Sequence, residues 1–219
     1  MPKETKKMDK KIELGIMLLT EAGVGKKVNA KSFYDVRRSG IISIKLHPGD
    51  SLVSASFVEK GDSLIMVTKK GQSIRFKEAD VREMGRQAAG VRGIKLGKGD
   101  SLVGSGVVPK GAKDAELLVL SSTGYGKKTD LSEYKTQGRG GSGIKTMSIT
   151  TKTKQLVGAS VILESGEIVA MSQKSQAIRT DLNEIPSLGR ATQGVRVMKL
   201  REGDQLASFV VFPDKNGEE

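Results

Sequence analysis

Three aspartates recur in this chain in similar surroundings, and a carboxylate is the first group to consider for acid–base chemistry. Asp50, Asp100 and Asp204 each follow a glycine and stand just before an apolar run. An aspartate in such a hairpin turn accepts hydrogen bonds from its own backbone. A catalytic carboxylate also has no need of a copy in most repeats of a chain. We therefore interpret these three residues as turn residues.

Two segments resemble the phosphate-binding loops of nucleotide-binding proteins, and neither satisfies the pattern. Residues 23–27 and 124–129 contain Gly-Lys, but Thr20 and Ser121 stand where such a loop needs its first glycine, and a lysine stands where Ser or Thr should coordinate the metal. His47, the only histidine, lies in a Pro-Gly turn without a second ligand, and the chain has no cysteine. The sequence therefore predicts no metal site and no bound cofactor.

The positive charges are periodic, and binding to a polyanion is the chemistry that they indicate. The chain has 37 Lys and Arg against 25 Asp and Glu, a formal net charge of +12. Lysine and arginine contact phosphates without reading bases, so a continuous stripe of them would hold duplex DNA of any sequence. A basic surface that only serves solubility is the alternative. The candidate DNA-binding residues are Lys26, Lys27, Arg37, Arg38, Lys45, Arg75, Lys77, Arg86, Arg92, Lys95, Lys127, Lys128, Arg139, Lys145, Arg179, Arg190, Arg196 and Lys199.

These charges recur because the chain consists of four copies of one unit. Gly40, Gly90, Gly143 and Gly194 share one register, at intervals of 50, 53 and 51 residues. Each copy has an apolar run, a turn, a basic strand and a Gly-flanked loop. A period of this length in short strands is typical of propeller-like or solenoid arrays, in which no unit buries its apolar face alone. The expected repeats are residues 13–58, 64–108, 117–163 and 168–212.

The expected fold is all-β, a propeller-like array of about four blades with about four antiparallel strands each, closed or open. We expect one domain over residues 12–213, preceded by a basic arm at 1–11 and followed by a polar tail at 214–219. Within it, residues 41–46 predict a strand and 78–84 a short helix. Aromatic residues are only 4%, so several small aliphatic cores are expected. No apolar run suits a membrane span or signal peptide, which favours an intracellular protein.

Three sequence segments resemble a known family: residues 73–100, 121–134 and 189–200. They resemble blades of the C-terminal domain of DNA gyrase A and, more distantly, of topoisomerase IV. The resemblance covers residues 12–213. It implies a β-pinwheel whose blades exchange a strand with their neighbours and whose basic perimeter wraps duplex DNA.

The same resemblance implies a non-catalytic accessory role in negative supercoiling, in the bacterial cytoplasm at the nucleoid. The implied partners are double-stranded DNA, the rest of the gyrase A protein and the gyrase B protein, with no membrane and no small-molecule substrate. ATP and Mg would belong to other parts of the enzyme.

The gyrase family is distinguished by a heptapeptide with the order Gln, basic, Arg, Gly, Gly, basic, Gly. The corresponding segment here matches at five positions and lacks the charge at both positions marked basic. In the family this box belongs to the first blade, whereas here it lies in the third repeat. Either the chain is a piece of a larger array, or it is a four-bladed variant in which this segment substitutes for the box. The segment is Gln137, Gly138, Arg139, Gly140, Gly141, Ser142 and Gly143, with Gly138 and Ser142 at the basic positions.

Three alternatives remain open from the sequence. The chain resembles topoisomerase IV domains, which have similar blades without the box and serve decatenation and substrate selection. Propellers of the chromosome-condensation-regulator kind have repeats of similar length and bind proteins, so their binding should not weaken steeply with salt. An enzyme built inside a propeller is the third alternative, and the missing catalytic cluster argues against it.

Overall fold

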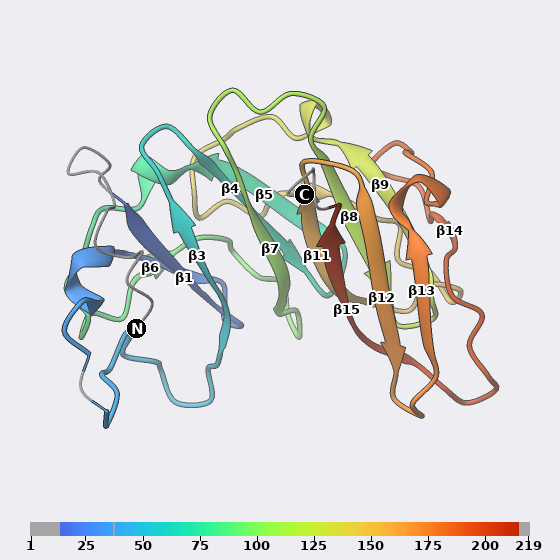
Figure 1. The fold of residues 1–219 in the computed structure, drawn as a ribbon, viewed down its shortest axis with the longest axis horizontal. Helices are drawn as coiled ribbons and strands as arrows, with labels where there is room; N and C mark the ends of the chain where they lie inside the picture. Colours follow the sequence, from blue (N-terminus) through green and yellow to red (C-terminus); the bar gives the residue numbers. More distant parts are fainter. Residues whose placement is uncertain (1–13, 37, 215–219) are drawn as a thin grey trace, which may run out of the picture.

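A computed structural model describes residues 14–36 and 38–214. The predicted basic arm, Arg37 and residues 215–219 of the predicted tail lie outside this part of the chain. Four antiparallel sheets follow one another in a curved row, from β1 (Gly15–Thr20) at one end to β12 (Gly166–Ser172) and β13 (Ala177–Asp181) at the other (Figure 1). The all-β, propeller-like prediction is confirmed, and the array is open. No helix within the described residues is long and apolar enough to cross a membrane.

Each sheet, called blade A to D in chain order, is built around a hairpin of two strands. Blade A has the strand order β3-β1-β2-β6, blade B β10-β5-β4-β7, blade C β11-β8-β9-β14 and blade D β13-β12-β15. The other strands are β2 (Val24–Asn29), β3 (Leu52–Val58), β4 (Ser63–Thr68), β5 (Gln72–Lys77), β6 (Val91–Arg92), β7 (Leu102–Val108), β8 (Glu116–Ser121), β9 (Tyr125–Asp130), β10 (Ile144–Lys145), β11 (Leu156–Ile162), β14 (Val195–Arg196) and β15 (Leu206–Pro213). Short 3-10 turns follow the hairpins at η2 (Ala30–Phe33), η3 (Glu78–Asp80), η4 (Leu131–Glu133) and η5 (Leu182–Glu184).

The fourth strand of a blade comes from the next repeat. Strand β6 of the second repeat pairs with β2, β10 of the third with β5, and β14 of the fourth with β9. This confirms the strand exchange that the resemblance implied. Blade D has three strands within the described chain, so the outer edge of β13 is unpaired there.

Two predicted elements are wrong in detail. Residues 41–46 form no strand, because no sheet edge within the described chain lies beside them. The helix predicted over 78–84 is only the 3-10 turn η3, since the chain after it pairs with the preceding blade. The amide of Met84 donates to the carbonyl of Lys27 at 2.9 Å, and Glu83 forms a parallel bridge with Lys27. Pairing between blades has replaced hydrogen bonding within a helix.

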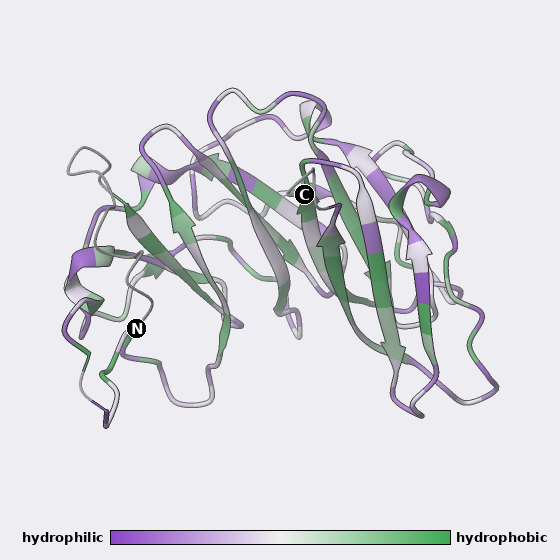
Figure 2. Ribbon diagram, viewed as in Figure 1, coloured by the Kyte–Doolittle hydropathy of each residue, from purple (hydrophilic) through white to green (hydrophobic). Residues whose placement is uncertain are grey.

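Apolar side chains fill the spaces between blades. The hydrophobic segments, green in Figure 2, lie mainly along the strands. Met17 and Leu19 of blade A share one cluster with Leu64 and Phe76 of blade B. Similar clusters join blades B and C and blades C and D. Burial of each such aliphatic side chain contributes about 1.5–3 kcal/mol to the free energy of unfolding. The expectation of several small cores is confirmed, and each blade buries apolar residues against its neighbours.

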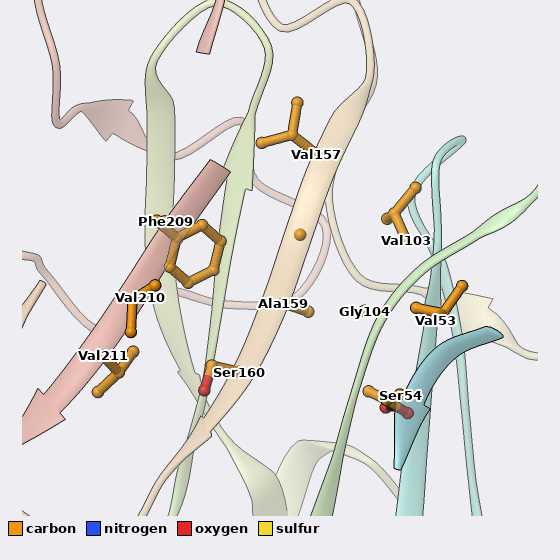
Figure 3. Close-up of a pocket in the computed structure, with 12 residues that line it drawn as sticks. Val53, Ser54, Val103, Gly104, Val157, Ala159, Ser160, Phe209, Val210 and Val211 are labelled. Atoms are coloured by element: carbon orange, nitrogen blue, oxygen red, sulfur yellow. Dashed lines mark hydrogen bonds between the residues drawn. The ribbon is translucent and has the colours of Figure 1, made fainter. Parts of the chain in front are cut away.

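The strands β3, β7, β11 and β15 contact one another from blade to blade and define the inner edge of the row. Gly104 of β7 allows this approach, because a Cβ atom there would lie 2.3 Å from the amide nitrogen of Ala159. The hydroxyls of Ser54 and Ser105 are 2.7 Å apart across β3 and β7. Together the four strands line a hollow of about 420 Å³, with Phe209 at one side (Figure 3). The exchanged strands β6, β10 and β14 therefore lie at the opposite, outer edge.

Candidate nucleic-acid interface

A glycine before each exchanged strand lets it reach the outer edge of the preceding blade. Gly143 has φ +74°, and a Cβ atom there would lie 2.3 Å from the carbonyl oxygen of Ser73. Gly194 repeats this with φ +73° and a distance of 2.4 Å from the carbonyl oxygen of Gly126. Only glycine combines positive φ with such close contact at low cost. The shared glycine register therefore marks strand exchange.

Each exchanged strand presents one exposed cation at the same position. Arg92, Lys145 and Arg196 pair across the sheet with Val24, Gln72 and Tyr125, which are equivalent positions of the three hairpins. We call Arg92, Lys145 and Arg196 the perimeter cations. Their side chains recur once in each of blades A, B and C along the outer edge of a curved row. Such an edge places cations at repeated intervals, as a phosphate backbone requires.

The predicted residues differ widely in exposure. The half-buried ones are Lys27, Arg75, Arg86, Lys128 and Arg190, and the buried ones are Lys26 and Lys127. Arg37 lies outside the described residues. The exposed ones, which stay candidates for DNA contacts, are Arg38, Lys45, Lys77, Arg92, Lys95, Arg139, Lys145, Arg179, Arg196 and Lys199.

Among the candidate DNA-binding residues, Lys26 and Lys127 have 0% of their surface accessible, which argues against a direct contact of either with DNA. The ammonium of Lys127 donates to the carbonyl oxygens of Gly189 and Arg190 at 2.5 and 2.8 Å. The ammonium of Lys26 donates in the same way to the carbonyl of Arg86, and to that of Ser43 at 2.8 Å. Each lysine thus anchors the Gly-flanked loop of the next repeat to its own blade.

Burial away from water lowers the pKa of the Lys127 ammonium from 10.5 to about 8. The carboxylate of Glu133 opposes this shift and the guanidinium of Arg190 adds to it. Burial, with a smaller effect of Arg86, also lowers the pKa of Lys26. In blade B the equivalent position is Ile74, which is fully buried. This register therefore points into the blades and its lysines have a positioning role.

The next residue along each hairpin is a cation that is largely occupied by partners. Lys27 contacts Glu78 at 2.5 Å and Lys128 contacts Glu116 at 2.8 Å. The equivalent arginine in blade D, Arg179, is paired with Glu167. In blade B, Arg75 donates to the hydroxyl of Ser63 at 3.0 Å and to the carbonyl of Leu131 at 2.9 Å, and burial lowers its pKa. Three of these cations are therefore paired with a carboxylate. The fourth, Arg75, is held by hydrogen bonds within the fold.

An arginine in the Gly-flanked loops of the second, third and fourth repeats joins two repeats. Arg139 donates to the carbonyl of Arg92 at 3.0 Å, and Arg190 donates to that of Lys145 at 3.1 Å. Arg86 makes a longer contact of 3.5 Å with the equivalent carbonyl, that of Ile42. A guanidinium has five donors, so these contacts leave several for other acceptors. The loop arginines hold the exchanged strands side by side.

The box-like segment lies along the outer side of blade B. The amide of Gln137 donates to the carbonyl of Arg75 at 2.9 Å, and the carbonyl of Gly141 accepts from the amide of Lys95 at 2.8 Å. Arg139 also donates to the carbonyl of Asp80 at 2.8 Å. A Cβ atom on Gly141 would lie 3.7 Å from the side chain of Ile74. The segment therefore passes over isoleucine, whereas the corresponding loops of blades A and C are held by a buried lysine.

The recurring aspartates are turn residues, as predicted. The Oδ1 atom of Asp100 accepts from the amides of Lys70 and Ser101, both at 2.9 Å. Asp50 and Asp204 accept equivalent pairs of backbone hydrogen bonds. Each carboxylate thus fastens a blade's hairpin tip to the turn beside it.

Sequence reasoning missed one cationic hollow, at the tip of blade C. It measures about 350 Å³ and combines cations of two repeats with a tyrosine. The Arg196 guanidinium carbon lies 5.6 Å from the centre of the Tyr125 ring, and its nitrogen lies 3.3 Å from the tyrosine oxygen. The signal was the unusual turn at residues 150–154, which lacks the usual Gly-Asp. The lining residues are Thr123, Tyr125, Lys152, Arg196, Lys199 and Leu200.

Comparison with known sequences assigns this architecture to a family. A sequence model described as "DNA gyrase C-terminal domain, beta-propeller" matches residues 16–59, 62–109, 115–162 and 166–213. The chain is 51% identical over 192 residues to the DNA gyrase A protein of Streptococcus pyogenes and 50% identical over 194 residues to that of Treponema pallidum. These alignments cover 88% and 89% of this chain but 23% and 24% of the relatives. The chain thus spans about a quarter of their length.

Two solved structures share the fold. The structure of a DNA gyrase A C-terminal domain has a TM-score of 0.81 and 30% identity, over 93% of this chain and 67% of that one. The C-terminal domain of DNA topoisomerase IV has a TM-score of 0.86 and 24% identity, over 94% and 64% of the two chains, and shows a common fold. With four sequence matches and four blades linked by exchanged strands, this chain belongs to the DNA gyrase C-terminal domain family of β-propellers.

Proposed function

We propose that this chain binds duplex DNA without sequence specificity along the outer edge of its blades. The observation that carries the proposal is the register of the perimeter cations, one exposed cation at an equivalent position of each exchanged strand. Contacts of this kind go to phosphates, which position a duplex without distinguishing its bases. The exposed Lys95 and Lys199 follow Arg92 and Arg196 by three residues and widen the same edge.

The curvature of the row gives binding a mechanical consequence. A duplex that contacts successive blades must follow the curve, so binding bends it. Bending 20–30 base pairs by about 40–90° costs on the order of 1–6 kcal/mol, which several phosphate contacts can offset. The loop arginines support this, because they hold adjacent exchanged strands at fixed spacing. DNA bending or wrapping is therefore the expected result of binding.

Membership of the gyrase C-terminal domain family suggests the larger enzyme in which this DNA binding acts. We propose that the chain is the non-catalytic accessory domain of a gyrase A protein in the bacterial cytoplasm, close to the nucleoid. There it would wrap DNA for the negative supercoiling that the whole enzyme performs with ATP. The rest of the gyrase A protein and the gyrase B protein would be its partners, and would supply DNA cleavage and ATP hydrolysis.

The first test is the salt dependence of binding to a duplex of mixed sequence. For six to ten phosphate contacts, affinity should fall by about 10³–10⁵ between roughly 50 and 200 mM salt. Retention of affinity across that range would overturn the proposal and favour a propeller that binds protein.

A decatenating domain of the topoisomerase IV kind is the second candidate. The observation that favours it is the box-like segment, in which Gly138 and Ser142 replace the two basic positions. Religation of relaxed circular DNA in the presence of the chain separates the two. Gyrase-like wrapping should leave positive writhe, whereas binding without wrapping should leave the linking number unchanged.

A further inference from the structure

We propose that the hollow at the tip of blade C is a phosphate seat, which holds one DNA backbone phosphate more tightly than the other blades do. The inference rests on the proposed binding of duplex DNA and adds to it a preferred anchoring point. The seat consists of Arg196 and Lys199 from the fourth repeat, Lys152 from the third, and the hydroxyl of Tyr125, with Thr123 in its wall.

The Arg196 side chain is oriented before any ligand binds. Its guanidinium lies over the Tyr125 ring at 5.6 Å from the ring centre and contacts the tyrosine oxygen at 3.3 Å. Stacking on an aromatic face limits the freedom of a long side chain and leaves the remaining N–H donors for a ligand. Two parallel N–H donors of a guanidinium match two phosphate oxygens. The equivalent pairs in blades A and B are Arg92 with Val24 and Lys145 with Gln72, which offer no such ring.

The tip of blade C also lacks the carboxylate that the other tips contain. In blades A, B and D the turn aspartate accepts from the hairpin tip, at the amides of Ala22, Lys70 and Lys174. In blade C the turn at residues 150–154 is closed by neutral groups instead.

The hydroxyl of Thr153 accepts from the amide of Thr150 at 2.8 Å and donates to the carbonyl of Ser148 at 3.0 Å. The hairpin tip joins through Thr123, whose hydroxyl donates to the carbonyl of Lys152 at 2.5 Å. None of the described residues that line the hollow is acidic. The exchange of a carboxylate for a hydroxyl removes a nearby negative charge. Lys152 stands where blade B has Lys98, blade A has Pro48 and blade D has Glu202, so blade C keeps a lysine without a carboxylate beside it.

An anion with two acceptor oxygens fits this set of cationic donors better than an uncharged sugar would, because it also neutralises their charge. A backbone phosphate offers two unesterified oxygens, and both can accept from the guanidinium and from the lysines. One such phosphate occurs at each nucleotide of a strand that follows the outer edge. The seat would fix the register at which a duplex begins to follow the curve of the blades.

The test compares two double variants that remove the same charge. Lys152→Ala/Arg196→Ala empties the seat, and Lys98→Ala/Lys145→Ala changes the corresponding turn and exchanged-strand positions of blade B. Affinity for a mixed-sequence duplex is measured with both variants and the wild-type chain at one low salt concentration. We expect the seat variant to lose at least about tenfold more affinity than the blade B variant. Equal losses would overturn the seat but leave the proposed function standing, whereas no duplex binding by the wild-type chain would overturn both.

A second measurement uses inorganic phosphate as the probe and does not depend on DNA. Amide resonances of Thr123, Tyr125 and Arg196 should shift in a saturable way on titration of the wild-type chain, and Tyr125→Leu should weaken this response by several-fold because Arg196 loses its support. Shifts of similar size at exposed lysines on all blades would mean general ion association and would overturn the seat.

Discussion

Replacing Lys127 with methionine tests the assignment of this residue as a buried anchor. Its side chain is wholly inaccessible, and its ammonium donates to the carbonyls of Gly189 and Arg190. Burial lowers its pKa from 10.5 to about 8. Methionine has a similar length and no charge, so Lys127→Met removes the hydrogen bonds and the cost of desolvating the ammonium together.

The sign of the pH dependence follows from the two pKa values. Below pH 8 the amine of Lys127 is protonated in both the folded and the unfolded chain, so its contribution does not change with pH. Between pH 8 and 10.5 the unfolded chain keeps the proton and the folded chain releases it, so the free energy of unfolding rises with pH. The slope from this one group is about 1.4 kcal/mol per pH unit, or roughly 3 kcal/mol over the window.

Urea unfolding of the wild-type chain and of Lys127→Met, at pH values of about 7, 9 and 10, measures this effect. The wild-type free energy of unfolding minus that of the variant should increase through the series. Lys145→Met, which removes one charge from the outer edge, corrects for the change in net charge. A difference that stays constant from about pH 7 to 10 would refute the buried-anchor assignment.

Three further predictions concern single contacts. Gly143→Ala should destabilise the chain by on the order of 3 kcal/mol in urea unfolding, because a Cβ atom would meet a backbone oxygen at 2.3 Å. Gly40→Ala is its matched control, since Gly40 has φ +75° but no atom within 4 Å of the position of an added Cβ. The control should lower the free energy of unfolding by only about 1 kcal/mol. Equal losses in the two variants would contradict the strand-exchange account. Tyr134→Phe removes a buried 2.6 Å hydrogen bond with Thr146 and should cost about 1–2 kcal/mol in thermal unfolding; an unchanged midpoint would contradict this. Arg139→Ala should reduce DNA wrapping, measured as linking-number change, more than duplex affinity; equal losses would make it one phosphate contact among many.

The fold follows from the sequence to a large extent, because the signals are local. The hairpins, the aspartate turns and the glycine register are each specified by a few adjacent residues. Strand exchange itself came from the resemblance to a family, since pairing between β5 and β10 joins residues about 70 apart and leaves no local pattern. The strand predicted at 41–46 was wrong because strand formation also depends on a distant partner. The sequence there suits a strand, but a strand needs an adjacent sheet edge with which to pair.

The candidate interface was only partly accessible to sequence reasoning, because charge alone does not say which way a side chain points. Lys26 and Lys127 share their register with Ile74 and Ile178 in the other repeats. An isoleucine at an equivalent position marks the inner face of a strand, so comparison of the repeats contained the signal that these two lysines are buried. The seat at blade C depends on residues from two repeats, which only the folded structure brings together.

The central claim is that the outer edge of the blades binds the DNA backbone, and the salt dependence of matched variants tests it most directly. Arg92→Ala/Lys145→Ala/Arg196→Ala removes the three perimeter cations. Lys60→Ala/Lys110→Ala/Lys113→Ala removes three exposed lysines from the links between blades and leaves the outer edge intact. The slope of log affinity against log salt should become shallower by about 3 in the perimeter variant and change little in the link variant. An equal change in both variants would contradict the claim and assign DNA binding to net charge alone.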